Sequence, residues 1–228
     1  MAVTVKICGL RREADVLLCG ELGVGIAGFV VEYPLPVPWS LTESEAAGLL
    51  PLVAPPMKSC VVTGGDREKT LALALSLRPD FVQLHFNETL DDTRRIAWEL
   101  ASRGIGVIKT LPLPESARLA QFGTADVSAC AALISGSGAA AILVDSRAPE
   151  NAGDASSPPD FAVFREAKRA SGIPVILAGG ITPANVGNVL LSARPAMIDV
   201  MTGVESSPGV KDGAALRELL EKARGSCA

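Results

Sequence analysis

Short apolar runs alternate with longer amphipathic runs along the whole chain, at a spacing of about 25–30 residues. The apolar runs have the length of buried strands, and eight strands are expected, at 3–8, 25–32, 58–63, 81–85, 105–111, 140–145, 174–178 and 197–202. Runs such as EKTLALALSL carry apolar residues at i, i+3 and i+4. Helices are expected near 11–21, 42–53, 66–78, 89–103, 125–136, 160–171, 183–192 and 212–224.

Strands that alternate with helices and read as nearly continuous Val, Ile and Leu predict a parallel sheet covered on both faces. Eight such units in 228 residues predict a single (β/α)8 TIM barrel that spans 1–228 as one domain. A doubly wound open sheet is the alternative, but no GxGxxG motif follows the first strand. The long irregular segment 146–160 follows the sixth strand, and its length is typical of a mobile lid.

Composition narrows the classes of function. A net charge of −4, an aromatic content of 4% and the lack of a basic stripe disfavour a nucleic-acid partner. No apolar run reaches the roughly 18 residues of a membrane span, and no secretory signal is evident, so a cytoplasmic protein without a membrane partner is expected. Five scattered cysteines without a CxxC pair, and a single histidine, predict neither disulfides nor a metal site.

Polar residues occupy the ends of several expected strands, where barrels carry their catalytic groups. Cys8 ends the first strand, His85 the fourth and Asp145 the sixth. Each has a structural alternative, because strand cysteines are usually buried small hydrophobes and a strand-end Asp often caps the next helix. His85 either holds a substrate hydroxyl or is a satisfied core histidine, and Gln83 on the same strand face is expected to orient it.

Lys6 lies on the same strand face as Cys8, one layer deeper in the expected barrel. A buried lysine needs a partner, and Asp199 on the eighth strand is available because that strand closes against the first. A Lys6–Asp199 pair that leaves positive charge beneath the thiol is therefore expected. The alternative is that Lys6 contacts only water and backbone carbonyls.

Two segments have the composition of phosphate-binding loops, LAGGITPANV at 177–186 and MTGVESSPGVKD at 201–212. In the first, Thr182 and Pro183 predict a helix N-terminus with free amides, and in the second the Ser206–Ser207 pair is a candidate anion nest. Each alone is also typical of an ordinary turn, but together, after strands seven and eight, they favour phosphate. The amides expected to bind it are those at Gly179, Gly180, Gly203 and Val204.

The segments VKICGL, VQLH, ILVDS, LAGGITPANV and IDVMTGVESSPGVKD occur in order between residues 5 and 212 and together resemble the phosphoribosylanthranilate isomerase family of tryptophan biosynthesis. The resemblance implies a (β/α)8 barrel without a cofactor that converts a phosphorylated aminoaldose to an aminoketose by an Amadori rearrangement. It implies Cys8 as the general base and Asp145 as the general acid, on opposite sides of the sugar. These roles require a lowered pKa for Cys8 and a raised pKa for Asp145.

The chain departs from the family where the aryl group should bind. The family usually has Ser-Pro-Arg after the second strand to hold the anthranilate carboxylate, and this chain has 37–39 as Val-Pro-Trp. Trp39 can stack on an aromatic ring but cannot replace the charge. The carboxylate is then held by Arg11, Arg12 or Arg147, or the protein is a paralogue for another phosphorylated amino-sugar, or it is a non-catalytic phosphate-ligand binder. A monomer or homodimer is expected.

Overall fold

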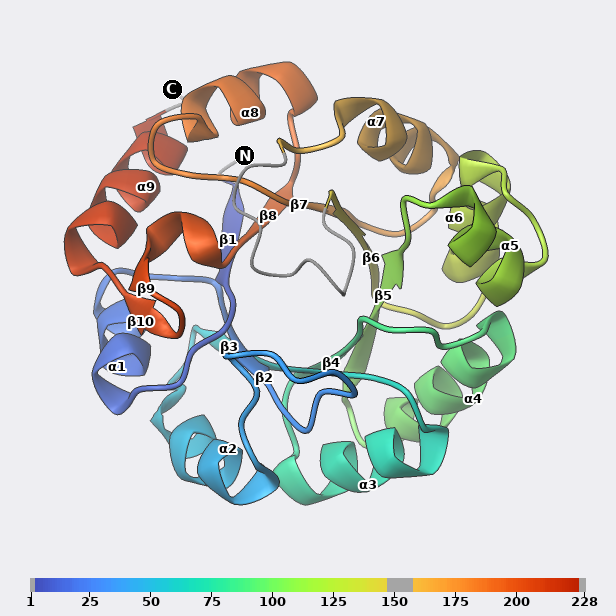
Figure 1. Cartoon of the computed structure of the whole chain (residues 1–228), viewed down its shortest axis with the longest axis horizontal. Coiled ribbons are helices and arrows are strands. Elements are labelled where there is room, and N and C mark those ends of the chain that lie inside the picture. Colours follow the sequence, from blue (N-terminus) through green and yellow to red (C-terminus); the bar gives the residue numbers. More distant parts are fainter. Residues whose placement is uncertain (1–2, 147–157, 226–228) are drawn as a thin grey trace.

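Eight parallel strands close into a barrel in the part of the chain that the computed structural model describes, residues 3–146 and 158–225. Each strand pairs with the next one along the chain, and β8 closes against β1 through pairs such as Lys6 with Asp199 (Figure 1). The expected (β/α)8 barrel is therefore confirmed. The strands are β1 Thr4–Ile7, β2 Ile26–Val30, β3 Lys58–Thr63, β4 Phe81–Leu84, β5 Gly106–Leu111, β6 Ala141–Asp145, β7 Val175–Ala178 and β8 Met197–Val200.

Helices form a ring around the barrel (Figure 1). They are α1 Glu13–Glu21, α2 Glu43–Leu49, α3 Arg67–Leu77, α4 Leu90–Ala101, α5 Glu115–Phe122, α6 Val127–Ser135, α7 Phe161–Ala170, α8 Val186–Ala193 and α9 Gly213–Gly225. Side-chain caps explain several starts: Thr42 and Thr89 form capping boxes before α2 and α4, and Asp66 accepts a bond from the backbone of α3.

Three elements differ from the sequence-based expectation. Helix α5 was not expected, and it is a short extra helix between β5 and α6 that ends at Gly123 in the left-handed conformation. The helix expected from 183 begins only at Val186. After β8, the turn η3 (Thr202–Val204) leads into an antiparallel hairpin of β9 (Glu205–Ser207) and β10 (Val210–Lys211).

The apolar residues divide into an outer and an inner layer. The outer layer, represented by Ile7, Phe29 and Ile142, packs between the strands and the helices. A smaller group that includes Ile108 and Ile176 fills the barrel interior. Because strand side chains alternate between these two layers, the polar side chains of Lys6 and its neighbours on the inner layer are enclosed by the barrel.

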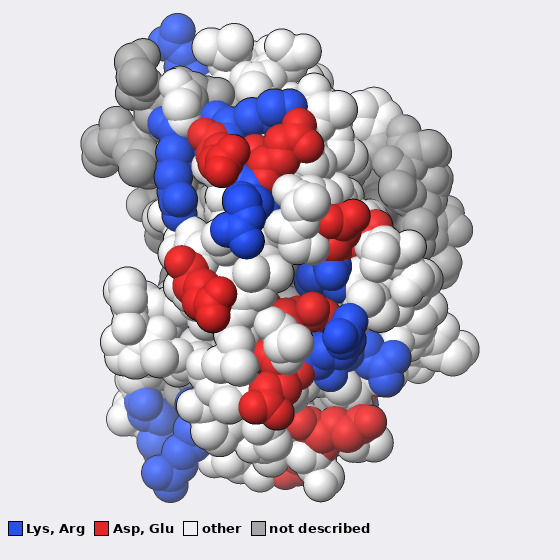
Figure 2. Space-filling model, turned by 90° about the vertical axis from the view of Figure 1, so that its left-hand side faces the viewer, with Lys and Arg blue, Asp and Glu red and all other residues white. Residues whose placement is uncertain are grey.

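Acidic and basic side chains are interspersed on the face over α1 and α9, which Figure 2 shows, and neither sign forms a patch there. Within residues 3–146 and 158–225, none of the helices is long and apolar enough to cross a membrane. In the same ranges, no three His, Cys, Asp or Glu side chains gather into a group that could hold a metal ion.

Candidate active site

Cys8 and Asp145 lie at the carboxyl end of the barrel, on strands from opposite sides of its mouth in Figure 1. Cys8 directly follows β1 and is 5% exposed, and Asp145 is the last residue of β6 and is 8% exposed. Parallel strands place such residues at one rim of the barrel. Both side chains are therefore largely removed from bulk water at the place where barrel enzymes bind substrate.

The expected ion pair beneath the thiol is present. Lys6 Nζ lies 2.8 Å from Asp199 Oδ2, and the lysine side chain is fully buried. Gly28 on β2 makes room for this arrangement, because a Cβ there would lie 3.1 Å from Cys8 Sγ and 3.2 Å from Lys6 Nζ. The thiol and the ammonium thus share one space beside a strand position without a side chain.

Burial sets the acidity of this pair of groups. Desolvation raises the pKa of the Cys8 thiol, although the positive charge and hydrogen bond of Lys6 act in the opposite direction. The expectation that the surroundings lower this pKa is therefore wrong. Burial alone would lower the pKa of Lys6, but the charges of Asp199 and Cys8 raise it above its ordinary value, so the ammonium stays charged.

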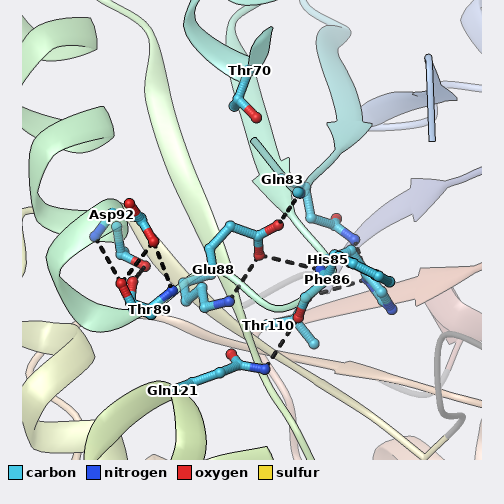
Figure 3. Close-up of polar contacts among 12 residues, drawn as sticks. Thr70, Gln83, His85, Phe86, Glu88, Thr89, Asp92, Thr110 and Gln121 are labelled. Carbon is cyan, nitrogen blue, oxygen red and sulfur yellow. Dashed lines mark hydrogen bonds and ion pairs between the residues drawn. The ribbon is translucent and has the colours of Figure 1, made fainter. Parts of the chain in front are cut away.

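His85, directly after β4, faces Asp145 across the mouth of the barrel. Its Nδ1 atom lies 2.9 Å from Gln83 Nε2 and 3.1 Å from Thr110 Oγ1, so the expected contact with Gln83 is present (Figure 3). Its Nε2 atom lies 3.9 Å from Asp145 Oδ2. The ring is therefore held between Gln83 and Thr110 on its Nδ1 side and faces the Asp145 carboxylate with its Nε2 side.

The loops after β7 and β8 pack directly on one another. Gly179 and Gly180 have positive φ angles of 93° and 53°, and a Cβ on Gly203 would lie 1.9 Å from the Ile181 carbonyl oxygen. This backbone arrangement requires glycine at these positions. Binding of phosphate to the Gly179, Gly180, Gly203 and Val204 amides stays a prediction.

Two details of the expected phosphate loops are wrong. Thr182 does not cap α8, because its N–H donates to Asn185 Oδ1 and the helix begins one residue after that asparagine. The second Asn185 contact, from Nδ2 to the Gly180 carbonyl, closes the turn. The Ser206–Ser207 pair belongs to the extended strand β9 and is exposed, so it does not form an anion nest.

Trp39 belongs to the same hydrophobic cluster as Cys8, and it is held by a charged pair that sequence reasoning missed. Its indole Nε1 donates to both carboxylate oxygens of Glu205, at 3.0 and 3.1 Å, and Lys211 Nζ lies 2.7 Å from the same carboxylate. The ring packs over Gly9, where a Cβ would lie 2.9 Å from Trp39 Cδ1. The only sequence signal for the pair is two opposite charges six positions apart in a turn-rich segment.

The three arginines expected to be able to bind the anthranilate carboxylate lie in different surroundings. Arg11 donates from Nη1 to the carbonyl of Pro38 at 2.7 Å, beside the loop that carries Trp39. Arg12 is exposed at the residue before α1. Arg147 and the rest of the candidate lid up to residue 157 lie outside the described residues. The partner of a substrate carboxylate therefore stays a prediction.

Comparisons with known proteins agree with this geometry. A family model described as N-(5'phosphoribosyl)anthranilate (PRA) isomerase matches residues 5–222. The N-(5'-phosphoribosyl)anthranilate isomerase of Natronomonas pharaonis is 31% identical over 97% of this chain and 98% of its own length, and that of Haloferax volcanii is 30% identical over 96% and 92%.

Solved structures lead to the same group. TrpF from Jonesia denitrificans is 29% identical with a TM-score of 0.77, and covers 100% of this chain and 99% of its own. Phosphoribosyl anthranilate isomerase from Thermotoga maritima is 27% identical with a TM-score of 0.79, at 98% and 99% coverage. A similar structure, 26% identical with a TM-score of 0.76 and 98% and 99% coverage, is a complex with reduced 1-(o-carboxyphenylamino)-1-deoxyribulose 5-phosphate.

Proposed function

The chain belongs to the N-(5'-phosphoribosyl)anthranilate isomerase family and is an aldose–ketose isomerase of tryptophan biosynthesis, and we propose that Cys8 is its general base and Asp145 its general acid. One observation carries the assignment. Cys8 directly follows β1 and Asp145 ends β6 at one rim of the barrel, each beside a group that can carry or deliver a proton: Lys6 beside Cys8, and His85 beside Asp145.

The proposed reaction uses these groups in two steps. Asp145 donates its proton to the ring oxygen of the ribose while the nitrogen lone pair forms C1=N and the C1–O bond breaks, which gives an open-chain iminium ion. The Cys8 thiolate then takes the proton from C2, the C2–H electrons form C1=C2, and the C=N electrons return to nitrogen. The resulting enolamine becomes the aminoketose when C1 gains a proton and the C2 hydroxyl loses one.

Lys6 is proposed to stabilise the thiolate, and Asp199 to hold Lys6 in place. An adjacent positive charge favours loss of the thiol proton, and this effect is stronger in a buried site, where water does not screen the charge. The fully buried ammonium, fixed at 2.8 Å from the Asp199 carboxylate, supports this role. Lys6 therefore opposes the rise in pKa that burial imposes on Cys8.

The substrate phosphate is proposed to bind the amides around Gly179, Gly180, Gly203 and Val204. Support comes from the positive φ angles in the first loop and the close packing of the second loop against it. A crystal soaked in sulfate should show the anion at these amides. Density confined to the opposite rim, near β2, would contradict the assignment.

The aryl end supports a second candidate, an isomerase for a different phosphorylated amino-sugar. Trp39 stands where the family has its carboxylate-binding arginine, and its N–H is already bonded to Glu205. The deciding experiment is a fluorescence assay with phosphoribosylanthranilate, run beside complementation of a tryptophan auxotroph that lacks this isomerase. Turnover with complementation supports the family substrate, and a failure of both supports the second candidate.

The proposal also covers the domain organisation, location, partners and oligomeric state of the protein. We infer that residues 1–228 form one domain, that the protein works in the cytoplasm without nucleic-acid or membrane partners, and that it is a monomer or homodimer. The interspersed charges on the α1 and α9 face support the absence of a nucleic-acid partner (Figure 2). One similar structure is described as generated monomers of the dimeric Thermotoga maritima enzyme. Light scattering during size-exclusion chromatography decides between monomer and dimer for this protein.

A further inference from the structure

A fully buried ion pair lies outside the barrel interior and has no part in the mechanism above. Glu88, in the loop between β4 and α4, and Lys109, on β5, have side-chain exposures of 0% and lie 3.0 Å apart. The ammonium is also 5.9 Å from the centroid of the Phe122 ring. Buried pairs of this kind are seldom more stabilising than apolar side chains of the same volume, so stability alone does not account for this one.

The Glu88 carboxylate ties together three separate segments at the carboxyl end of the barrel. One oxygen accepts from the N–H of Gly65 at 2.8 Å, in the loop after β3. The other accepts from the N–H of Phe86 at 3.2 Å and from Lys109 on β5 (Figure 3). Gly64 allows the close approach, because a Cβ there would lie 2.3 Å from Glu88 Oε1.

These contacts fix the backbone that carries His85. The Phe86 carbonyl accepts from Gln121 Nε2 at 3.1 Å, and the His85 carbonyl accepts from the Tyr33 hydroxyl at 2.6 Å. The N–H of His85 donates to the Thr63 carbonyl at 3.1 Å. With Glu88 on the N–H of Phe86, each polar group of this dipeptide backbone has a partner, so the imidazole has a defined point of attachment.

We propose that Glu88, paired with Lys109, is a positioning residue that orients the His85 imidazole toward Asp145 and thereby keeps the general acid in its working position. This inference rests on the proposed role of Asp145. Glu88 acts through the backbone of Phe86 and His85, and the ring is then aligned by Gln83 so that its Nε2 atom faces the carboxylate. Glu88 itself touches no reacting atom.

The test removes the charges of Glu88 and Lys109 together. Glu88→Gln alone would leave a buried ammonium without its counter-ion, so the variant is Glu88→Gln with Lys109→Met, which keeps the volume and leaves one fewer acceptor for the two backbone N–H groups. We expect this variant to fold and to have kcat reduced about tenfold. Its KM should change less than about twofold, because the phosphate loops are untouched. Asp91→Asn with Arg95→Met, which removes the exposed ion pair of α4, is the matched control and should keep wild-type kcat.

The chain has one histidine, so nitrogen NMR of labelled imidazole reports His85 alone. Wild type should show one dominant tautomer, because the ring is held in a single orientation, and the charge-free variant a mixture of tautomers. In a His85→Ala background the charge-free substitution should cause no further loss of kcat, because its effect passes through the imidazole. The Cβ of Gly64→Ala would lie 2.3 Å from Glu88 Oε1 and 2.7 Å from Phe86 Cβ, so this variant displaces both residues that hold the His85 backbone without changing any charge. It should reproduce both the NMR change and the loss of kcat, and it serves if the double variant does not fold.

A folded charge-free variant with wild-type kcat and an unchanged histidine spectrum would overturn the inference. So would a loss of kcat that persists in full in the His85→Ala background. Asp145→Asn separates this outcome from a failure of the proposed function. If that variant keeps turnover, the acid assignment is wrong; if it is inactive while the charge-free variant is normal, only the role of Glu88 is wrong.

Discussion

Removing the ion pair beneath Cys8 should weaken the base without disturbing the rest of the site. The perturbation is Lys6→Met with Asp199→Asn, because Lys6→Met alone would leave a buried carboxylate without a partner. Both side chains keep roughly their volume, so the inner layer of the barrel stays packed. The thiol then remains buried but loses the charge that opposes its desolvation.

The size of the effect follows from the geometry at Gly28. Cys8 Sγ and Lys6 Nζ each lie close to the same point, so they are at most about 6 Å apart. At an effective dielectric constant of about 20, opposite unit charges at that separation attract by about 3 kcal/mol, or about two pKa units. The charge of Asp199 acts in the opposite direction and more weakly, so its removal offsets part of this. A net rise of about one unit in the pKa of Cys8, and about tenfold less thiolate at pH 7, is expected.

The assay is the pH dependence of kcat with phosphoribosylanthranilate. Burial already raises the pKa of Cys8 above its ordinary value of 9.0. The base acts as the thiolate, whose fraction rises with pH through this pKa, so its titration appears at alkaline pH, as the alkaline limb of the profile. In the double variant kcat at pH 7 should fall about tenfold, and the alkaline limb should move about one unit to higher pH. Circular dichroism and thermal unfolding check that the variant is folded. A folded variant whose alkaline limb and kcat match wild type would refute the role of Lys6.

Three further substitutions test the other parts of the site. Cys8→Ser should lower kcat by about two to four orders of magnitude with the fold intact, because a hydroxyl is not ionised at neutral pH, and near-normal turnover would end its assignment as the base. Asp145→Asn should lower kcat while affinity for a simple sugar phosphate is retained, and the reverse pattern in titration calorimetry would mean a positional role. Trp39→Arg should not raise kcat/KM, because the guanidinium meets the Glu205 carboxylate that now accepts from the indole; a tenfold gain would show that the arginine reaches the substrate.

Short-range patterns in the sequence were enough to predict most of the fold and part of the site. The alternation of strands and helices was enough for the barrel, and the two-residue strand period was enough to place Lys6 and Cys8 on one face, with Asp199 beside them. The hairpin of β9 and β10 and the short helix α5 were missed because neither has enough residues to show a period. Glu88 was missed because its partners come from three loops and strands that no local pattern connects.

The expected direction of the Cys8 pKa shift was wrong for a different reason. The sequence revealed a lysine on the same face as the thiol, which by itself predicts a lowered pKa. The outcome depends on how completely the barrel removes both groups from water, and this is a property of the packed interior rather than of any residue pattern. Burial outweighs the neighbouring charge here, so the direction of the shift was reversed.

Gly28 has a consequence for how this protein tolerates mutation. The residue has no side chain and no chemical role, yet any larger residue would occupy the space shared by Cys8 Sγ and Lys6 Nζ. In a saturation mutagenesis screen scored by growth without tryptophan, position 28 should therefore be as intolerant as the thiol itself. A ranking of positions by growth phenotype alone would place this glycine among the catalytic residues. Its intolerance to substitution would come only from the space that the missing side chain leaves for Cys8 and Lys6.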